Sequence, residues 1–456
     1  MPFQIPQPAP VDTPVVNAPT QVDLDPTRKV ACYAGLGMIF VLLSVISELL
    51  YFVLHINTYL LYIFGPIAML GAVVTGAIGR TFRSRGPYLL MALFIWMVIS
   101  TPFSSWRSVS LGRVMNFAQF DLPLLVLIGG LIVNWKEIRF VFYTFAAAGG
   151  VVLLGSRLFT YSVEEGRVSL EASGTIGNSN DLASHLLFLL PFLMYVTMDP
   201  QRNRVFRIAL WGPIIYGLWV ILGTASRGGV LGLAGAILFM LYRGSMGQRF
   251  TLLVVAPLLA VILGGALPQQ TLVRLGTLVG QQHEEAKESG ESRSYLFKKS
   301  VQYTLEHPVF GIGVDTFATY ERGEATKKGE YGNWHATHCS WTEVSTDCGI
   351  PGLLFYVGAW VSSILLVNRT YRVARQHGNR EVIRACFCYL LSLIGFLISI
   401  TFLSNAYRMY FPLMVGLAVS LHYAAMRQMG SSGAAPQPVP AQQPFSRSSV
   451  HSMPVR

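Results

Sequence analysis

Two histidines stand close together in a polar stretch, residues 331–353, of a chain in which charged residues make up only 12% of the total. His335 and His338 are three residues apart and precede Cys339, a spacing that could ligate a metal ion. A helical pair of this kind needs further ligands, which the sequence does not identify, so we expect no metal site. His338 could instead accept a proton from a hydroxyl nucleophile, because histidine changes charge near neutral pH. A hydrogen-bonded structural histidine is the alternative.

Two arginines lie where their charge requires an explanation. Arg227 follows a serine and precedes two glycines at the start of an apolar run. The planar donor fork of a guanidinium suits phosphate groups, and the glycines would let a ligand approach the backbone closely. Snorkelling to lipid head groups is the alternative. Arg293 lies on the apolar face of a helix predicted over 292–306, so it requires an anion or a carbonyl partner if buried, with an ion pair to a nearby glutamate as the alternative.

Three further residues are candidates for contact with a substrate. Asn180 lies in the Asn-Ser-Asn-Asp run at 178–181, where it could cap a helix or contact a sugar. Trp341 offers an aromatic ring on which a sugar could stack. His335 joins the candidate substrate-binding set as the neighbour of His338.

These residues are embedded in a strongly apolar chain. Hydrophobic residues account for 52% of the 456, and apolar runs long enough to cross a bilayer recur throughout. The expected fold is therefore all-α, a polytopic membrane protein with about twelve transmembrane helices. The runs lie at about 30–54, 57–78, 87–103, 118–134, 138–160, 181–198, 208–224, 228–243, 251–267, 350–367, 385–403 and 410–427. The net charge of +11 does not indicate nucleic acid binding, because basic residues of membrane proteins gather in loops on one side.

The basic residues predict the orientation in the membrane. If the N terminus is cytoplasmic, the cytoplasmic loops carry most of the lysines and arginines, as the positive-inside rule requires. The short outward segments hold only Arg107, Arg113, Arg157, Arg167, Arg227 and Arg408. We expect a disordered cytoplasmic tail at 1–29, nine spans within 30–267, one large periplasmic loop with its own helices at 268–349, three spans within 350–427, and a second disordered cytoplasmic tail at 428–456.

The combination of motifs resembles the O-antigen ligase and polymerase superfamily of bacterial envelope glycosyltransferases. The family signature is similar to His338-Cys-Ser-Trp341-Thr-Glu-Val-Ser-Thr-Asp347-Cys-Gly349-Ile-Pro351-Gly352. Shorter elements of the family are similar to His307-Pro308-Val-Phe-Gly311-Ile-Gly313, Ser292-Arg293, Ser226-Arg227-Gly228 and Gly177-Asn-Ser-Asn180-Asp-Leu-Ala183. Cys339 replaces the usual Asn, Ser179 the Pro and Asp347 the Glu, so the acceptor preference could differ from that of a typical member.

The resemblance covers roughly residues 30–427 and implies a function. A member would transfer a glycan from an undecaprenyl-diphosphate-linked donor to an acceptor hydroxyl at the periplasmic face of the bacterial inner membrane, without a cofactor. The acceptor would be lipid A core for a ligase, a growing polysaccharide for a polymerase, or a protein hydroxyl for a third group. Our hypothesis is that Arg227 and Arg293 bind the donor diphosphate while His338 activates the acceptor. We favour a ligase or polymerase over a protein transferase.

Two other classes of protein remain open. A twelve-span transporter of an envelope precursor would place its site near the membrane midplane, on intramembrane charges. Glu48 is the best candidate for such a charge, and His185 and Asp181 lie near a membrane boundary. A noncatalytic glycan-binding scaffold would tolerate the loss of His338 but not of its tryptophans.

Overall fold

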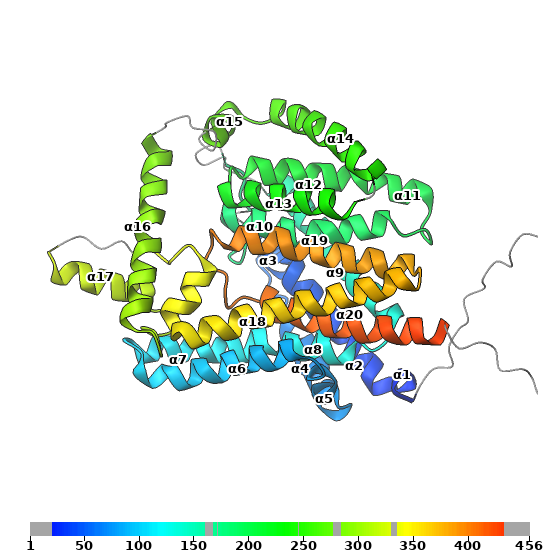
Figure 1. Cartoon of the computed structure of the whole chain (residues 1–456), viewed down its shortest axis with the longest axis horizontal. Helices are drawn as coiled ribbons and strands as arrows, with labels where there is room; N and C mark the ends of the chain where they lie inside the picture. Colours follow the sequence, from blue (N-terminus) through cyan, green and yellow to red (C-terminus); the bar gives the residue numbers. More distant parts are fainter. Residues whose placement is uncertain are drawn as a thin grey trace, which may run out of the picture.

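The computed structural model describes residues 21–159, 167–170, 172–244, 246–276, 284–329 and 335–432. Every regular element in these ranges is helical, and most helices run along a common direction in one bundle (Figure 1). Much of the two expected tails, residues 1–20 and 433–456, lies outside the described residues. The described ends of those tails are helical, because residues 26–29 belong to α2 and residues 428–432 belong to α20.

The helices cover each of the twelve apolar runs. The first half contains α1 (Gln21–Leu24), α2 (Pro26–Ser44), α3 (Ile46–Leu54), α4 (Leu60–Val74), α5 (Ala77–Thr81), α6 (Arg85–Ser100), η1 (Thr101–Phe103), α7 (Arg107–Asn116), the π-helical η2 (Phe117–Asp121), α8 (Leu122–Leu131), α9 (Trp135–Leu158) and α10 (Ser179–Thr197). The second half contains α11 (Arg204–Ala209), α12 (Trp211–Gly223), α13 (Arg227–Arg243), α14 (Met246–Gly265), α15 (Gln269–Gly276), α16 (Glu284–Glu306), α17 (Phe317–Lys327), α18 (Ser340–Gln376), α19 (Arg380–Ile400) and α20 (Tyr410–Ser432).

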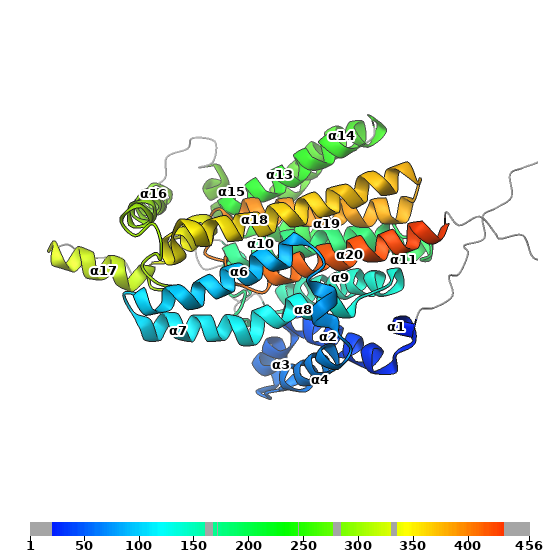
Figure 2. The same ribbon diagram turned by 60° about the horizontal axis from the view of Figure 1, so that its bottom comes forward.

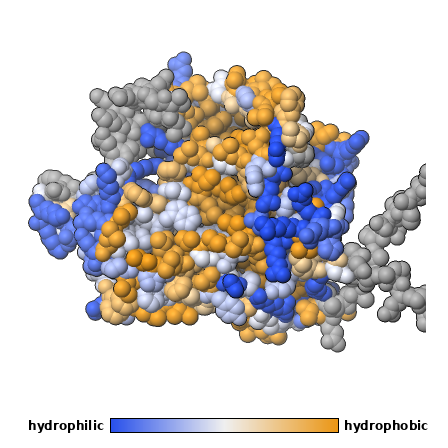
Figure 3. Space-filling model, in the orientation of Figure 1, coloured by the Kyte–Doolittle hydropathy of each residue, from blue (hydrophilic) through white to orange (hydrophobic). Residues whose placement is uncertain are grey.

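The all-α polytopic class is confirmed. Within the described ranges, eight helical segments are long and apolar enough to cross a membrane: Pro26–Ser44, Arg85–Phe103, Arg107–Leu131, Trp135–Leu158, Ser179–Thr197, Arg204–Gly223, Ser340–Gln376 and Arg380–Ile400. Leucines such as Leu70, Leu238 and Leu365 are more than 60% exposed, as lipid-facing residues are. Hydrophobic side chains cover the middle of the face in Figure 3, and hydrophilic ones gather toward its left and right ends. The total of twelve spans stays a prediction.

Helix α10 forms the centre of the bundle. It is buried along nearly its whole length and packs against α9, α12, α13 and α19. Helices α18, α19 and α20 pack against one another, and Figure 2 shows them running side by side. The N-terminal ends of α10 and α18 and the segment that precedes α20 therefore meet at one end of the bundle.

The fourth span begins earlier than the apolar run at 118–134 indicates. The helical segment starts at Arg107, because the polar residues of α7 have partners within the protein. Arg113 donates through Nη2 to the carbonyl of Tyr407 at 3.1 Å. Ser110 donates through Oγ to the carbonyl of Val314 at 2.9 Å. A hydropathy pattern cannot show that polar residues form hydrogen bonds with distant segments of the chain.

Helix α18 is kinked at Gly349, the end of the expected outward loop. Gly349 has φ 69° and ψ −173°, so the axis breaks where the polar half of α18 gives way to the apolar half. The segment 308–313 runs along this break. The amide of Ile350 donates to the carbonyl of Pro308 at 2.8 Å, and the amide of Gly313 donates to the carbonyl of Asp347 at 3.1 Å. The two glycine motifs of the sequence therefore form one structural unit.

Alanine at Gly349 is expected to destabilise the protein far more than alanine at Gly378. Both glycines have positive φ, but Gly349 combines φ 69° with ψ −173°, a region that is essentially restricted to glycine. A Cβ at Gly349 would lie 2.3 Å from the carbonyl oxygen of Val309, whereas nothing lies within 4 Å of one at Gly378. The clash adds about 1–3 kcal/mol. Thermal unfolding in detergent should give a clearly lower midpoint for Gly349→Ala, and equal midpoints would contradict this account.

Candidate active site

The loop between α19 and α20, residues 401–409, supports the histidine and is called the support loop below. The backbone amide of His338 donates to Ser404 Oγ at 3.0 Å, and Thr337 Oγ1 lies 3.1 Å from the same oxygen. Ser340 Oγ donates to the carbonyl of Leu403 at 2.7 Å. These bonds hold His338 with φ 52°, a left-handed conformation that is uncommon for a residue with a side chain. The protein therefore fixes the position of this imidazole at some conformational cost.

His338 is neutral at neutral pH. Burial lowers its pKa to about 4, and the positive charge of Arg293 and the neighbouring His335 lower it further, while Asp181 opposes them. Arg293, His335 and Asp181 are thus all close enough to act on the imidazole electrostatically. A neutral imidazole has a ring nitrogen that can accept a proton from a hydroxyl group.

In a plot of kcat/KM against pH, the midpoint of the acid limb is expected to lie well below the usual pKa range of histidine. A lowered pKa means that His338 keeps its neutral form from pH 8 down to about 5, and that half of it is protonated near pH 4. The measurement is kcat/KM against pH, with far-UV circular dichroism at each pH to confirm that the protein remains folded. A midpoint near 6.5 in folded protein would contradict the assignment of His338 as the group that must be neutral.

Asn180 is tied to the turn that precedes Arg227. Asn178, rather than Asn180, caps α10, since its Oδ1 accepts the amide of Asp181 at 2.9 Å. The Oδ1 of Asn180 accepts from Arg167 Nη2 at 2.9 Å, and Arg167 Nε donates to the carbonyl of Thr224 at 3.0 Å. Arg167 therefore joins the start of α10 to residues 224–227.

Arg227 is half-buried at the first position of α13. Ser226 caps this helix, because its Oγ accepts the amide of Gly229 at 3.2 Å. A positive side chain at a helix N-terminus adds to the positive end of the helix dipole, so this position favours a bound anion.

The glycines after Arg227 serve packing between helices. A Cβ at Gly228 would lie 3.0 Å from Phe402 Cβ in the support loop, and a Cβ at Gly229 would lie 2.8 Å from Ala183 Cβ in α10. These contacts account for both glycines without a ligand, and ligand approach to their backbone stays a prediction. They bring α13 and Arg227 close to α10 and to the support loop.

Arg293 lies half-buried on α16. The helix predicted over 292–306 is confirmed, and it begins eight residues earlier, at Glu284. Hydroxyl groups fasten α16 to α18: Thr346 Oγ1 donates to the carbonyl of Ser300 at 2.9 Å, and Thr304 Oγ1 lies 2.9 Å from Ser345 Oγ. These bonds place Arg293 near enough to His338 to lower its pKa.

Several residues of this region were not anticipated from the sequence. Asn405 Nδ2 donates to Asp181 Oδ1 at 3.3 Å, and Arg408 Nη1 donates to the carbonyl of Thr175 at 2.9 Å. Glu343 Oε2 accepts the amide of Ala406 at 3.1 Å. The support loop is therefore bonded to α18, to α10 and to the segment before α10. One signal could have revealed Arg167 and Arg408: both belong to the few arginines expected on the outward side.

Comparison with known protein families gives a match to part of this chain. Residues 212–357 match the model of a family described as O-antigen ligase. These residues are called the O-antigen ligase segment below, after the family that they match. The family consists of membrane glycosyltransferases of the ligase and polymerase type, which agrees with the resemblance derived from the motifs. A search of curated proteins finds none that matches the chain.

The O-antigen ligase segment contains Arg227, Arg293 and His338, whereas Asn180 and the support loop lie outside it. Helix packing brings Asn180 and the support loop close to the O-antigen ligase segment. The candidate site thus draws on two regions of the chain, and the second is identified only by its contacts in three dimensions.

Trp341 and His335 occupy different surroundings within the O-antigen ligase segment. Trp341 Nε1 donates to Thr401 Oγ1 at 3.0 Å, and its ring packs edge-on against Tyr356 with the ring centroids 5.6 Å apart, so the described contacts of Trp341 are structural ones. His335 is exposed, with its ring centroid 6.2 Å from that of His338. In the described ranges, no three histidine, cysteine, aspartate or glutamate side chains gather in an arrangement that could hold a metal ion.

Proposed function

We propose that the protein transfers a glycan from an undecaprenyl-diphosphate-linked donor to an acceptor hydroxyl at the periplasmic face of the bacterial inner membrane, as an O-antigen ligase or a surface polysaccharide polymerase. The observation that carries the proposal is the neutral, half-buried His338 within the electrostatic range of Arg293, inside the O-antigen ligase segment. Gly228, the residue after Arg227 in α13, packs against Phe402 of the support loop, which also supports His338.

The chemistry follows from the charges. The acceptor oxygen forms a bond to the anomeric carbon while the bond from that carbon to the diphosphate oxygen breaks. Negative charge develops on the departing lipid diphosphate, and positioned guanidinium groups stabilise such charge. The hydroxyl proton passes to the imidazole of His338 and from there to the released diphosphate or to solvent. A base whose pKa is about 4 is weak, so proton transfer to it comes late, after the bond to the anomeric carbon has begun to form.

Substrate contacts by the remaining candidates belong to the same proposal. Asn180 would contact a sugar through its amide NH2, because its Oδ1 already accepts from Arg167. His335, which is exposed beside His338, would contact the acceptor. Trp341 would offer only the part of its ring that packing against Tyr356 leaves accessible.

The transporter is the weaker alternative, because the polar residues that favoured it have structural partners. Glu48 accepts from the hydroxyls of Ser173 and Thr175 and so anchors the segment before α10. His185 is buried, with Nδ1 2.7 Å from the hydroxyl of Tyr410 and Nε2 2.8 Å from the carbonyl of Leu43. A coupling residue in a transporter requires a partner that changes during the cycle. The contacts of Glu48 instead join α3 to the segment before α10, and those of His185 join α10 to α20 and α2.

Reconstitution tests the proposal and separates its alternatives. Purified protein is placed in liposomes with an undecaprenyl-diphosphate oligosaccharide, and the products are resolved on a gel. A ladder from donor alone identifies a polymerase, and transfer only after lipid A core is supplied identifies a ligase. Transfer only to a protein acceptor identifies the third group of the family. The absence of a product with every acceptor would contradict the proposal and favour a transporter.

A further inference from the structure

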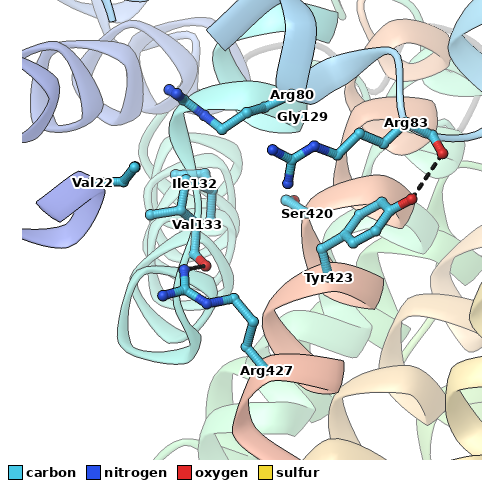
Figure 4. A pocket seen from close by; sticks show the side chains of 9 residues that line it. All are labelled: Val22, Arg80, Arg83, Gly129, Ile132, Val133, Ser420, Tyr423 and Arg427. Carbon is cyan, nitrogen blue, oxygen red and sulfur yellow. Dashed lines mark hydrogen bonds between the residues drawn. The ribbon is translucent and has the colours of Figure 1, made fainter. Parts of the chain in front are cut away.

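A cavity of about 270 Å³ lies among α5, α8 and α20, and Figure 4 shows the residues that line it. Its lining combines three arginines, Arg80, Arg83 and Arg427, with the apolar side chains of Ile132 and Val133. Figure 4 shows Ile132 and Val133 with Arg80 above them, Arg427 below them and Arg83 to their right. The cavity therefore presents concentrated positive charge next to an apolar wall.

This cavity lies at the end of the bundle opposite to His338. Helix α20 begins at Tyr410, directly after the support loop, and Arg427 lies seventeen residues further along. At about 1.5 Å per residue, this separation is roughly 25 Å along the helix axis. The distribution of basic residues predicts that this end faces the cytoplasm. The cavity is thus distinct from the proposed diphosphate site.

The arginines are held in place by the backbone around them. Arg80 donates through Nε to the carbonyl of Gly130 at 2.7 Å and through Nη1 to the carbonyl of Thr75 at 2.5 Å. Its remaining nitrogen, Nη2, is buried and has no hydrogen-bond partner among the described residues. A buried donor of this kind requires an acceptor, and a charged donor requires it most.

The other two arginines are also positioned. The guanidinium of Arg83 lies 5.6 Å from the ring centroid of Tyr423, and the hydroxyl of Tyr423 donates to the carbonyl of Arg83 at 2.7 Å. Arg427 donates through Nη1 to the carbonyl of Val133 at 2.9 Å. Asp25 and Glu137 act electrostatically on Arg80, but the residues that line the cavity include no carboxylate, so a bound anion would further offset its three like charges. Arginine matches the oxygens of a phosphate group better than any other side chain, because its donors form a planar fork.

We propose that this cavity binds the phosphate of an anionic phospholipid, such as phosphatidylglycerol, in the cytoplasmic leaflet. The three arginines contact the phosphate oxygens, and the apolar wall formed by Ile132 and Val133 contacts the adjoining part of the lipid. Basic pockets between transmembrane helices on the cytoplasmic side are typical sites for anionic head groups. A free phosphate ion would use the same donors but would gain nothing from the apolar wall.

Native mass spectrometry in neutral detergent tests the proposal with the full chain. The probes are phosphatidylglycerol, phosphatidylcholine and inorganic phosphate, and the variant is Arg83→Gln with Arg427→Gln. A matched control, Arg204→Gln with Arg372→Gln, removes two exposed charges at the same end of the bundle. We expect one phosphatidylglycerol to bind the wild type and the control alike, and to bind the cavity variant at least about tenfold more weakly.

Other outcomes would overturn the proposal. Equal binding of phosphatidylglycerol to both double variants would show that the cavity is not the site. Equally tight binding of inorganic phosphate, or of phosphatidylcholine, would show that the site does not select an anionic lipid. A second measurement does not depend on variants: a photoactivatable phosphatidylglycerol should cross-link to wild-type protein within 129–133 or 420–427, and cross-links only elsewhere would overturn the proposal.

Discussion

Replacing His338 by asparagine is expected to lower kcat for glycan transfer by about a hundredfold or more, because the acceptor hydroxyl loses the imidazole that takes its proton. Asparagine is the informative substitution. It tolerates the left-handed backbone that His338 adopts at φ 52°, whereas alanine would add strain at the same position. The measurement is single-turnover transfer in liposomes, which reports the chemical step directly.

His335→Asn is the matched control for this variant. His335 is exposed and lies beside His338, so its loss removes the same chemical group without removing the proposed base. We expect it to change kcat less than tenfold and to act mainly on KM for the acceptor. If His338→Asn retained near-normal turnover while folding normally, His338 would be a structural residue and the proposed mechanism would be wrong.

The apolar pattern predicted the helices well because a bilayer demands long runs of uncharged residues. It failed where polar side chains find partners inside the protein. The helical segment from Arg107 was shortened in the prediction because Ser110 and Arg113 read as loop residues, yet both bond to backbone carbonyls of distant segments. The same limit applies to the polar half of α18, which is helical from Ser340 although its residues suggested a loop.

The sequence also identified the candidate site only in part. His338 and Arg293 could be proposed from short-range patterns, namely a polar cluster and an arginine on the apolar face of a helix. The support loop could not, because Ser404 and Asn405 are ordinary polar residues between two spans. Their importance comes from bonds to residues more than sixty positions away in the sequence. Spacing along the chain contains no information about such contacts.

Arg293→Gln is expected to have two separable effects. The first is a loss of about 10²–10³ in kcat/KM, the usual consequence of removing one donor that stabilises transition-state charge. The second is an upward shift of the acid limb of the pH profile. Arg293 lowers the pKa of His338, so without its charge the imidazole takes up a proton at a higher pH. Burial still disfavours protonation of the imidazole, so the new pH midpoint of the acid limb should lie between about 4 and the usual histidine pKa near 6.5.

Arg293→Lys separates these two effects. Lysine keeps the charge but loses the planar fork, so kcat/KM should fall while the acid limb stays near its wild-type position. Lys298→Gln provides the control for charge alone, since Lys298 is an exposed residue of the same helix, α16. It should change neither quantity. A pH midpoint that shifts equally in Arg293→Gln and Lys298→Gln would mean that the net charge of α16, rather than the position of Arg293, sets the pKa of His338. In that case Arg293 would lose its specific link to the reacting proton, although it could still bind the diphosphate.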